Sequence, residues 1–225
     1  MSQKLSVVIP TLNASASLPN TLATLMEGVF AEIVADLIIS DGGSTDGTIE
    51  IAHEVGATLV TSRPSRGGQI AVGVSACKSD WILILHADSC LGAGWSSIDL
   101  GSLDVDCAYY SRLRFDADTL MARCVASWAN IRSRLFALPY GDQGLLIHKS
   151  LLSSIDGYPS PPIMEDVVIA RKLGWRLRAL PTMITTSADK YIKQGWTRRG
   201  VRNLMMLLQF LLGASPEKLY KKYYS

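Results

Sequence analysis

Cysteine is scarce in the sequence, and the four that occur are not paired. The 225 residues contain only Cys77, Cys90, Cys107 and Cys124, which lie 13, 17 and 17 residues apart. Without a Cys-x-x-Cys pair, a structural zinc site and a disulfide scaffold are both disfavoured. No secretory signal opens the chain, so we expect a reduced, cytoplasmic protein whose cysteines are small buried apolar residues.

Long apolar runs are also missing. The nearest candidate, Leu204–Leu212, falls short of the roughly 18–20 residues that cross a bilayer and is interrupted by Gln209. A membrane-spanning helix is therefore not expected. Disorder is disfavoured as well, because 48% of the residues are hydrophobic and can bury a sizeable core.

A net charge of +2 conceals an uneven distribution. Residues 1–189 hold 14 Lys and Arg against 19 Asp and Glu, whereas residues 190–225 hold 8 against 1. We therefore divide the chain into an acidic domain, 1–189, and a basic, amphipathic helical tail, 190–225. The acidic domain and the lack of a recognition motif disfavour a nucleic-acid partner.

Strand and helix patterns alternate through the first ninety residues. Apolar runs predict strands and helical spacing predicts helices, in the order strand 5–10, helix 18–26, strand 37–40, a helix ending at 54, strand 58–61, helix 69–77 and strand 81–85. Apolar strands separated by helices indicate a parallel sheet covered on both faces. Beyond residue 100 we expect strands at 106–115, 144–147 and 176–180, and helices at 119–135, 164–173, 197–212 and 215–223.

Polar residues follow the first four predicted strands directly. In chain order these residues are Thr11 and Asn13, Asp41, Arg66, and the pair His86 and Asp88. Ligands of parallel sheets bind at the carboxyl ends of the strands. The sequence therefore predicts a binding pocket at this edge of the sheet.

The loop Asp41–Thr48 is rich in glycine and carries two carboxylates. It contains no GxxxxGK[ST] pattern, and its carboxylates disfavour direct contact with phosphate. A carboxylate here can accept hydrogen bonds from a base or a ribose. The alternative is a turn in which Asp46 caps the following helix.

His86 and Asp88 end an apolar strand two residues apart, so their side chains point to the same side. They can flank one divalent cation that also binds a pyrophosphate, because phosphate oxygens and water fill the remaining positions. The alternative is a histidine at a strand end followed by a capping aspartate.

Two other polar segments each have two interpretations. Glu165 and Asp166 open a helix, where acids either serve the helix dipole or act as a general base beside a pocket. Tyr140–Gln143 is either a turn or a set of hydrogen-bonding groups for a hydroxyl-rich ligand.

Taken in order, these segments resemble the family 2 glycosyltransferases with the GT-A fold. The matching stretches are Ser6–Asn13, Asp41–Thr48, Arg66–Gln69, Leu85–Asp88 and Met164–Asp166. A finer resemblance is to small bacterial members with L-H-A-D-[ST], G-D-Q and P-I-M-E-D motifs, which are here Leu85–Ser89, Gly141–Gln143 and Pro162–Asp166. The resemblance extends from residue 6 to about residue 180.

The resemblance implies an α/β fold of the GT-A type, in which helices flank a mostly parallel nucleotide-binding sheet and a helical appendage closes the chain. It also implies a metal-dependent, inverting, hexosyltransferase-like enzyme. Such an enzyme moves a sugar from a nucleoside-diphosphate sugar to an acceptor hydroxyl or a lipid phosphate. Uridine and guanosine donors fit equally well.

The resemblance further assigns roles by position. It implies nucleotide-sugar binding by Pro10, Thr11, Asn13, Asp41, Arg66, Gly67, Gln69 and Asp88, with Asp41 contacting the base. It implies that Asp166 is the catalytic base beside Glu165, and we assign Asp142 and Gln143 to the acceptor. The cation, Mn²⁺ or Mg²⁺, is expected on Asp88 and His86. His86 stands where the family usually has an aspartate, and imidazole suits Mn²⁺ better than Mg²⁺.

The basic tail has three compatible interpretations. It can pack on the domain as an amphipathic helix, lie on an anionic membrane surface with Trp196 at the headgroups, or close one or two arginines over the donor diphosphate. A peripheral position on the inner face of the membrane would suit a lipid-linked acceptor.

Two other functions compete with glycosyl transfer. A nucleotidyltransferase is expected to carry a basic residue in a glycine-rich loop after the first strand, where this chain has Thr11-Leu12-Asn13. A non-enzymatic sensor or scaffold would bind the nucleotide sugar without turning it over.

Overall fold

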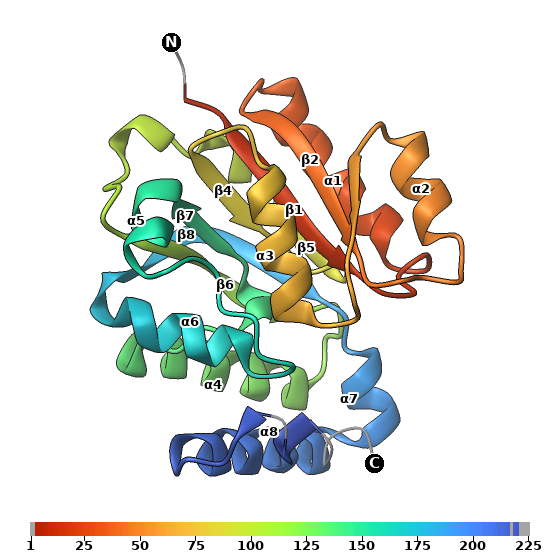
Figure 1. Cartoon of the computed structure of the whole chain (residues 1–225). Coiled ribbons are helices and arrows are strands. Elements are labelled where there is room, and N and C mark those ends of the chain that lie inside the picture. Colours follow the sequence, from red (N-terminus) through yellow and green to blue (C-terminus); the bar gives the residue numbers. More distant parts are fainter. Residues whose placement is uncertain (1–2, 217, 221–225) are drawn as a thin grey trace.

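The computed structural model describes residues 3–216 and 218–220, and it builds them around one curved sheet with helices on both faces (Figure 1). The sheet has eight strands in the order β3-β2-β1-β4-β7-β6-β8-β5. The strands are β1 Leu5–Thr11, β2 Val34–Asp41, β3 Thr58–Thr61, β4 Trp81–Ile84, β5 Ser89–Leu91, β6 Ala108–Phe115, β7 Leu145–His148 and β8 Leu177–Thr186. The α-helices are α1 Leu18–Phe30, α2 Thr48–Glu54, α3 Arg66–Ala76, α4 Leu120–Phe136, α5 Lys149–Ser154, α6 Glu165–Leu173, α7 Asp189–Gln194 and α8 Trp196–Leu211.

The first half of the sheet is parallel, as predicted. Every residue of β1 is buried, and β1 pairs in parallel with β2 on one side and β4 on the other. Continuous apolar strands of this kind need helices on both faces, which α1 and α3 provide (Figure 1). The carboxyl ends of β1, β2 and β4 therefore meet at one edge.

The second half of the sheet is mixed. β7 runs antiparallel to β4 and β6, whereas β6 and β8 are parallel. β8 continues to Thr186, six residues beyond the predicted end at 180. Pro181 explains why the strand was predicted to end at residue 180, because proline lacks the N–H that a central strand must donate. A register irregularity between Tyr110 and Arg112 of β6 accommodates it.

The tail packs on the domain instead of standing apart from it. The Trp196 ring meets Phe115 of β6 edge-on at 5.2 Å and stacks on Tyr191 of α7 at 4.8 Å between ring centroids. Met206 and Leu207 of α8 are buried, and α8 lies against α4. The predicted helix at 197–212 is confirmed, whereas α7, α5 and β5 were not predicted. Part of the predicted helix at 215–223 lies outside the described residues.

No helix in the described part of the chain is long and apolar enough to cross a bilayer. All four cysteines are free, and Cys77 and Cys107 are buried as expected. Cys124 of α4 is exposed instead, because the apolar contacts of α4 are made by the opposite side of the helix.

Candidate functional site

A cavity of about 620 Å³ opens at the carboxyl ends of the parallel strands. Its walls come from four parts of the chain: the ends of β1 and β4, the first turn of α3, the segments around Tyr140 and Pro162, and the helices α7 and α8. Ten predicted residues line it, namely Pro10, Thr11, Asn13, Arg66, Gln69, His86, Asp88, Asp142, Glu165 and Asp166. The predicted pocket at this edge of the sheet is therefore present.

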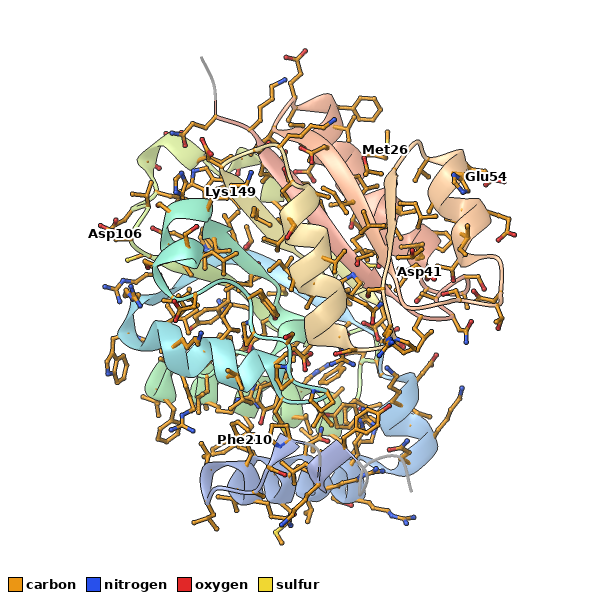
Figure 2. All side chains as sticks on the ribbon, viewed as in Figure 1. Met26, Asp41, Glu54, Asp106, Lys149 and Phe210 are labelled. Carbon is orange, nitrogen blue, oxygen red and sulfur yellow. The ribbon has the colours of Figure 1, made fainter. Side chains whose placement is uncertain are left out.

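Asp41, at the end of β2 (Figure 2), does not line the cavity but contacts Thr11, which does. Its side chain is fully buried and accepts hydrogen bonds from the Thr11 hydroxyl at 2.9 Å and from the backbone N–H groups of Gly43 and Ser44, both at 2.7 Å. Burial raises the pKa of this carboxyl, but these bonds and the Ser44 hydroxyl outweigh it, and the net pKa is lowered. Asp41 therefore holds the glycine-rich loop in shape as an ionised carboxylate, and contact with a base stays a prediction.

The same loop is tied to the segment that follows β1. The Asn13 side-chain oxygen accepts from the Thr45 N–H at 2.9 Å, and the Asp46 carboxylate accepts from the Ser15 hydroxyl at 2.7 Å. Asp46 also accepts from the N–H of Thr48, the first residue of α2, at 3.1 Å. The loop is therefore a turn that leads into α2, and these bonds fix the cavity wall that Asn13 lines. The cap position of α2 is Gly47, without a side-chain cap, so the interpretation of Asp46 as the helix cap is wrong.

Gln69 and Gly67, in the first turn of α3, have packing contacts that the motif did not reveal. The buried Gln69 amide donates to the carbonyl oxygens of Thr11 at 2.6 Å and Ser40 at 3.0 Å, which joins the ends of β1 and β2. Gly67 does not line the cavity. A Cβ there would lie 2.6 Å from the Pro159 carbonyl oxygen, so only glycine lets the segment before α6 cross this helix so closely.

Arg66 connects α3 to the start of α6. Its Nη1 lies 3.3 Å from Oε1 of Glu165, whose side chain is only 3% exposed. Burial first, and the neighbouring Asp166 second, raise the pKa of Glu165 above its ordinary value, while Arg66 lowers it. A buried carboxylate paired with a cation is a positioning arrangement, and it keeps the Arg66 guanidinium at the cavity.

Asp166 presents its carboxylate to the cavity from the first turn of α6. Oδ2 accepts from the Gly141 N–H at 3.2 Å and Oδ1 from the Val167 N–H at 2.8 Å. Asp166 is more exposed than Glu165, which is buried. The backbone at Met164 has φ 64°, a left-handed conformation that turns the chain into the helix.

Asp142 is the least satisfied carboxylate of the cavity. Its Oδ1 is buried without a hydrogen-bond partner among the described residues. Burial raises its pKa to about 6; Asp166 and Asp88 add to the rise, and Arg132 opposes it. Arg132 itself is buried, with its guanidinium carbon 3.4 Å from the centre of the Tyr140 ring.

Gln143 does not line the cavity. Its side chain is fully buried, accepts from the Ser133 hydroxyl at 2.5 Å and donates to the Ser111 carbonyl oxygen at 3.1 Å. It therefore joins α4 to β6, and the short 3₁₀ turn Gly141–Gln143 matches the turn interpretation of this motif. A contact between Gln143 and an acceptor stays a prediction.

The predicted cation ligands are not equivalent. Burial first and Arg66 second lower the pKa of His86 well below its ordinary value, so the ring is neutral. A Cβ on Gly141 would lie 2.4 Å from His86 Nε2, so the tip of the ring packs against the Gly141 backbone. Asp88 is 30% exposed, with Oδ2 3.6 Å from Nζ of Lys190.

Within the described residues, no three His, Cys, Asp or Glu side chains form a cluster that could hold a metal. Of the two predicted ligands, His86 and Asp88, the Asp88 carboxylate is the one that is partly exposed. The residues present fit a cation that takes most of its ligands from phosphate oxygens and water, with Asp88 as its protein ligand. They do not fit a cage made entirely of protein groups.

The tail supplies cavity residues that the strand-end motifs did not include. Lys190, Tyr191, Arg199, Asn203 and Met206 all line the cavity from α7 and α8. Arg199 donates to Gln194 at 2.8 Å, while its buried Nε has no partner among the described groups. Arg199 is therefore the arginine of α8 that lines the cavity, and its contact with a donor diphosphate stays a prediction.

Comparison with known proteins places the chain among glycosyltransferases. The family model described as "Glycosyl transferase family 2" matches residues 6–119. An uncharacterized glycosyltransferase of Mycobacterium tuberculosis is 29% identical over 188 residues, which cover 76% of this chain and 81% of that protein.

Solved structures share the fold at low sequence identity. TarS of S. aureus has a TM-score of 0.63 and 14% identity over 95% of this chain, which spans 40% of the TarS chain. Glucosyl-3-phosphoglycerate synthase from Mycobacterium tuberculosis, solved with Mn²⁺, uridine diphosphate and glucosyl-3-phosphoglycerate, has a TM-score of 0.57 and 20% identity over 90% of this chain and 79% of its own. The predicted α/β fold of the GT-A type is confirmed.

Proposed function

Because the chain belongs to glycosyl transferase family 2, we propose that its cavity transfers a sugar from a nucleoside-diphosphate sugar to an acceptor hydroxyl or a lipid phosphate, with inversion. The observation that carries this proposal is the meeting of opposite charges in one cavity. Asp166 stands at one wall, and Arg66, Lys190 and Arg199 line others.

The nucleotide end of the donor fits the side of the cavity formed by the end of β1. Pro10, Thr11 and Asn13 line this side, and the bonds from Asn13 to Thr45 and from Thr11 to Asp41 hold it in place. A wall already held by internal hydrogen bonds loses little conformational freedom when a ligand binds. Uridine and guanosine remain the two candidate bases.

The diphosphate fits between Arg66 and Lys190. Arg66 is held at the cavity by Glu165, so we propose that Glu165 is a positioning residue. Lys190 lies beside Asp88, and from there its ammonium group can contact the donor diphosphate. A divalent cation, Mn²⁺ or Mg²⁺, held by Asp88 would supply further positive charge for the leaving diphosphate. His86 is neutral and stands next to this position.

The acceptor reacts at the wall formed by Asp166 and Asp142. As its oxygen forms a bond to the anomeric carbon, the bond from that carbon to the diphosphate oxygen breaks, and the configuration inverts. For a hydroxyl acceptor, the Asp166 carboxylate takes the proton, and the electron pair of the broken bond leaves with the diphosphate. The bonds from Gly141 and Val167 keep the carboxylate in its position.

The substitution Asp166→Asn tests this assignment. We expect sugar transfer to fall by about 10²–10⁴-fold, because general-base catalysis contributes about that much. Binding of the nucleoside diphosphate, measured by calorimetry, should stay unchanged, since the amide keeps the shape of the side chain.

Asp156→Asn is the matched control. Asp156 is exposed, outside the cavity, and has φ 64°, a conformation that asparagine adopts readily. A transfer rate near that of the wild type in Asp166→Asn would contradict the role of Asp166. Donor binding without turnover in the wild type would favour a sensor.

A further inference from the structure

Helix α8 is apolar on two opposite sides. Met206 and Leu207 are buried against the domain, as the inner side of a packed helix should be. Apolar residues also occupy the outer side, where at least 43% of each is exposed: Val201, Leu204, Met205, Leu208, Leu211 and Leu212, the last of which just follows the helix. Soluble proteins rarely expose a continuous apolar stripe of this kind, so the outer side of α8 indicates a second apolar environment.

Helix α4 repeats the pattern. Ala122, Ala126 and Ala129 face the sheet, while the opposite side exposes Leu120, Met121, Trp128, Ile131 and Leu135, with Phe136 at its end. Most of these exposed residues recur at helical spacing, so they form a stripe. Helices α4 and α8 are in contact, and both lie at the end of the molecule away from the start of β1 (Figure 1). We name their two exposed stripes together the α4–α8 face.

Neither α4 nor α8 contains Asp or Glu. Arg134 of α4 and Arg198 and Arg202 of α8 are exposed. The other three arginines do not add net charge to the surface: Arg132 is buried, Arg199 lines the cavity, and Arg123 pairs with Asp118 at 2.6 Å. Lys193 adds another positive charge at the end of α7. On α8, Arg198 and Arg202 border the exposed apolar stripe on the helical wheel, the arrangement of helices that lie in a membrane interface.

We infer that the α4–α8 face binds an anionic lipid bilayer, with its leucines and Trp128 among the acyl chains and its arginines at the headgroups. Charge complementarity decides between possible occupants. In a symmetric dimer this face would meet a copy of itself, which carries charge of the same sign because neither helix contains Asp or Glu. An anionic bilayer offers both the apolar layer and the negative charge.

The position of the cavity agrees with this inference. Asn203 and Met206 line the cavity from the inner side of α8, while Leu204 and Leu208 are on its exposed side. One helix therefore separates the reaction cavity from the proposed lipid surface. A lipid-linked acceptor held in the bilayer would come within a helix diameter of the cavity, about 10 Å.

Vesicle sedimentation tests the inference without any need for turnover. The full chain is mixed with vesicles of phosphatidylcholine alone or with phosphatidylglycerol added. We expect the wild type to sediment with the anionic vesicles and to bind the neutral ones far less. The triple variant L204Q/L208Q/L211Q should bind at least about tenfold more weakly, because three exposed leucines are lost from the stripe.

A control changes three apolar residues elsewhere that are at least as exposed. M26Q/V29Q/F30Q alters three such residues at the end of α1 and should sediment like the wild type. Circular dichroism and thermal unfolding establish that each variant is folded. The charge reversal R198E/R202E should also bind anionic vesicles about tenfold more weakly, since each basic residue near the surface contributes to attraction.

Three outcomes would overturn the inference. These are equal binding to neutral and anionic vesicles, wild-type binding by L204Q/L208Q/L211Q, and a dimer of the wild type in solution that this triple variant abolishes. The last result would assign the face to a second copy of the chain. Because none of these measurements uses a sugar donor, failure here leaves the proposed glycosyl transfer untouched.

Discussion

The three acids at the acceptor side of the cavity differ in what surrounds each carboxylate. Asp166 is held by two backbone N–H groups, Glu165 is paired with Arg66, and one oxygen of Asp142 is buried without a partner in the described structure. Repulsion between neighbouring carboxylates adds to burial, so a site of this kind holds negative charge at a cost in stability. A ligand that carries a cation or hydroxyl groups would offset this cost when it binds, because it interacts favourably with the carboxylates.

The substitution Asp142→Asn should therefore stabilise the protein at neutral pH. The pKa of Asp142 is about 6 in the folded protein, above its ordinary value of 3.8, so the folded state binds the proton more tightly than the unfolded state. Below the unfolded pKa of 3.8 both states are largely protonated, so the substitution matters little there, and its effect is still small at pH 4. Above pH 6 the ionised carboxylate costs up to about 3 kcal/mol, which the amide avoids.

Urea unfolding at pH 4 and pH 7.5 measures this difference. The free energy of unfolding of Asp142→Asn should exceed that of the wild type at pH 7.5 and approach it at pH 4. Asp106→Asn, at an exposed loop position, is the control and should show no such pH dependence. A variant less stable than the wild type at pH 7.5 would mean that the carboxylate is well satisfied.

At the scale of elements, the first turn of α3 supports the start of α6. Gly67 lies under Pro159 and Ser160, and Arg66 beside it binds Glu165. One helical turn therefore positions the segment that carries both acidic residues of the Met164–Asp166 motif. The contact depends on the absence of a side chain at a single position.

Gly67→Ala should displace this segment. The added Cβ would lie 2.6 Å from the Pro159 carbonyl oxygen and 2.9 Å from Ser160 Cα, both backbone atoms, so the segment must move. We expect a loss of about 1–3 kcal/mol in unfolding free energy, the usual cost of overpacking, and a fall in kcat larger than any change in donor affinity.

Gly68→Ala provides the matched control in the same turn. There the added Cβ would meet only the Ser65 side chain, at 3.4 Å, and alanine favours the helix by about 0.5–1 kcal/mol. Equal effects of the two substitutions on stability and kcat would show that the close approach at Gly67 has no special role.

The success of sequence-based prediction also varied by element. β1, β2 and β4 are buried apolar runs that end in polar residues, and this local pattern was enough to locate one edge of the cavity. β8 was predicted to end too early because Pro181 interrupts the apolar pattern of the strand. The structure accommodates this proline because the pairing of β8 with β6 has an irregular register there. α7 has no buried residue and thus no apolar periodicity to reveal it.

Side-chain direction set the limit within the site. The motifs that contain Asp41, Gly67 and Gln143 were identified, but none of these residues lines the cavity. The side chains of Asp41 and Gln143 make internal hydrogen bonds, and Gly67 allows another segment to pack closely because it has no side chain. Lys190 and Arg199 line the cavity on either side of Trp196, which packs against Phe115, 81 positions earlier in the chain. Spacing within one motif carries no information about such contacts.

At the scale of the whole molecule, ligand binding should raise thermal stability. A ligand that binds only the folded state stabilises it by mass action, about 2.7 kcal/mol at a concentration of one hundred times Kd. A thermal-shift panel of uridine and guanosine diphosphates and their sugars, each with Mn²⁺, Mg²⁺ or a chelator, identifies the base and the cation together. We expect one base to stabilise more than the other, and the chelator to reduce its shift.

Asp88→Asn supplies the control for the cation. If Asp88 is its protein ligand, this variant should lose the extra stabilisation due to Mn²⁺ and keep most of that due to the nucleotide alone. An unchanged Mn²⁺ effect in the variant would place the cation elsewhere. The division of the chain at residue 189 stays a prediction, although the packing of Trp196 on Phe115 joins the tail to the domain.

Helix α8 has one further consequence, which is thermodynamic. Asn203 and Met206 face the cavity and Leu204 and Leu208 face outward on the same rigid helix. If occupancy of one side shifts this helix, binding at the two sides is linked, and the linkage is reciprocal. If binding to a bilayer changes the affinity for the donor by some factor, binding of the donor must change the affinity for the bilayer by the same factor.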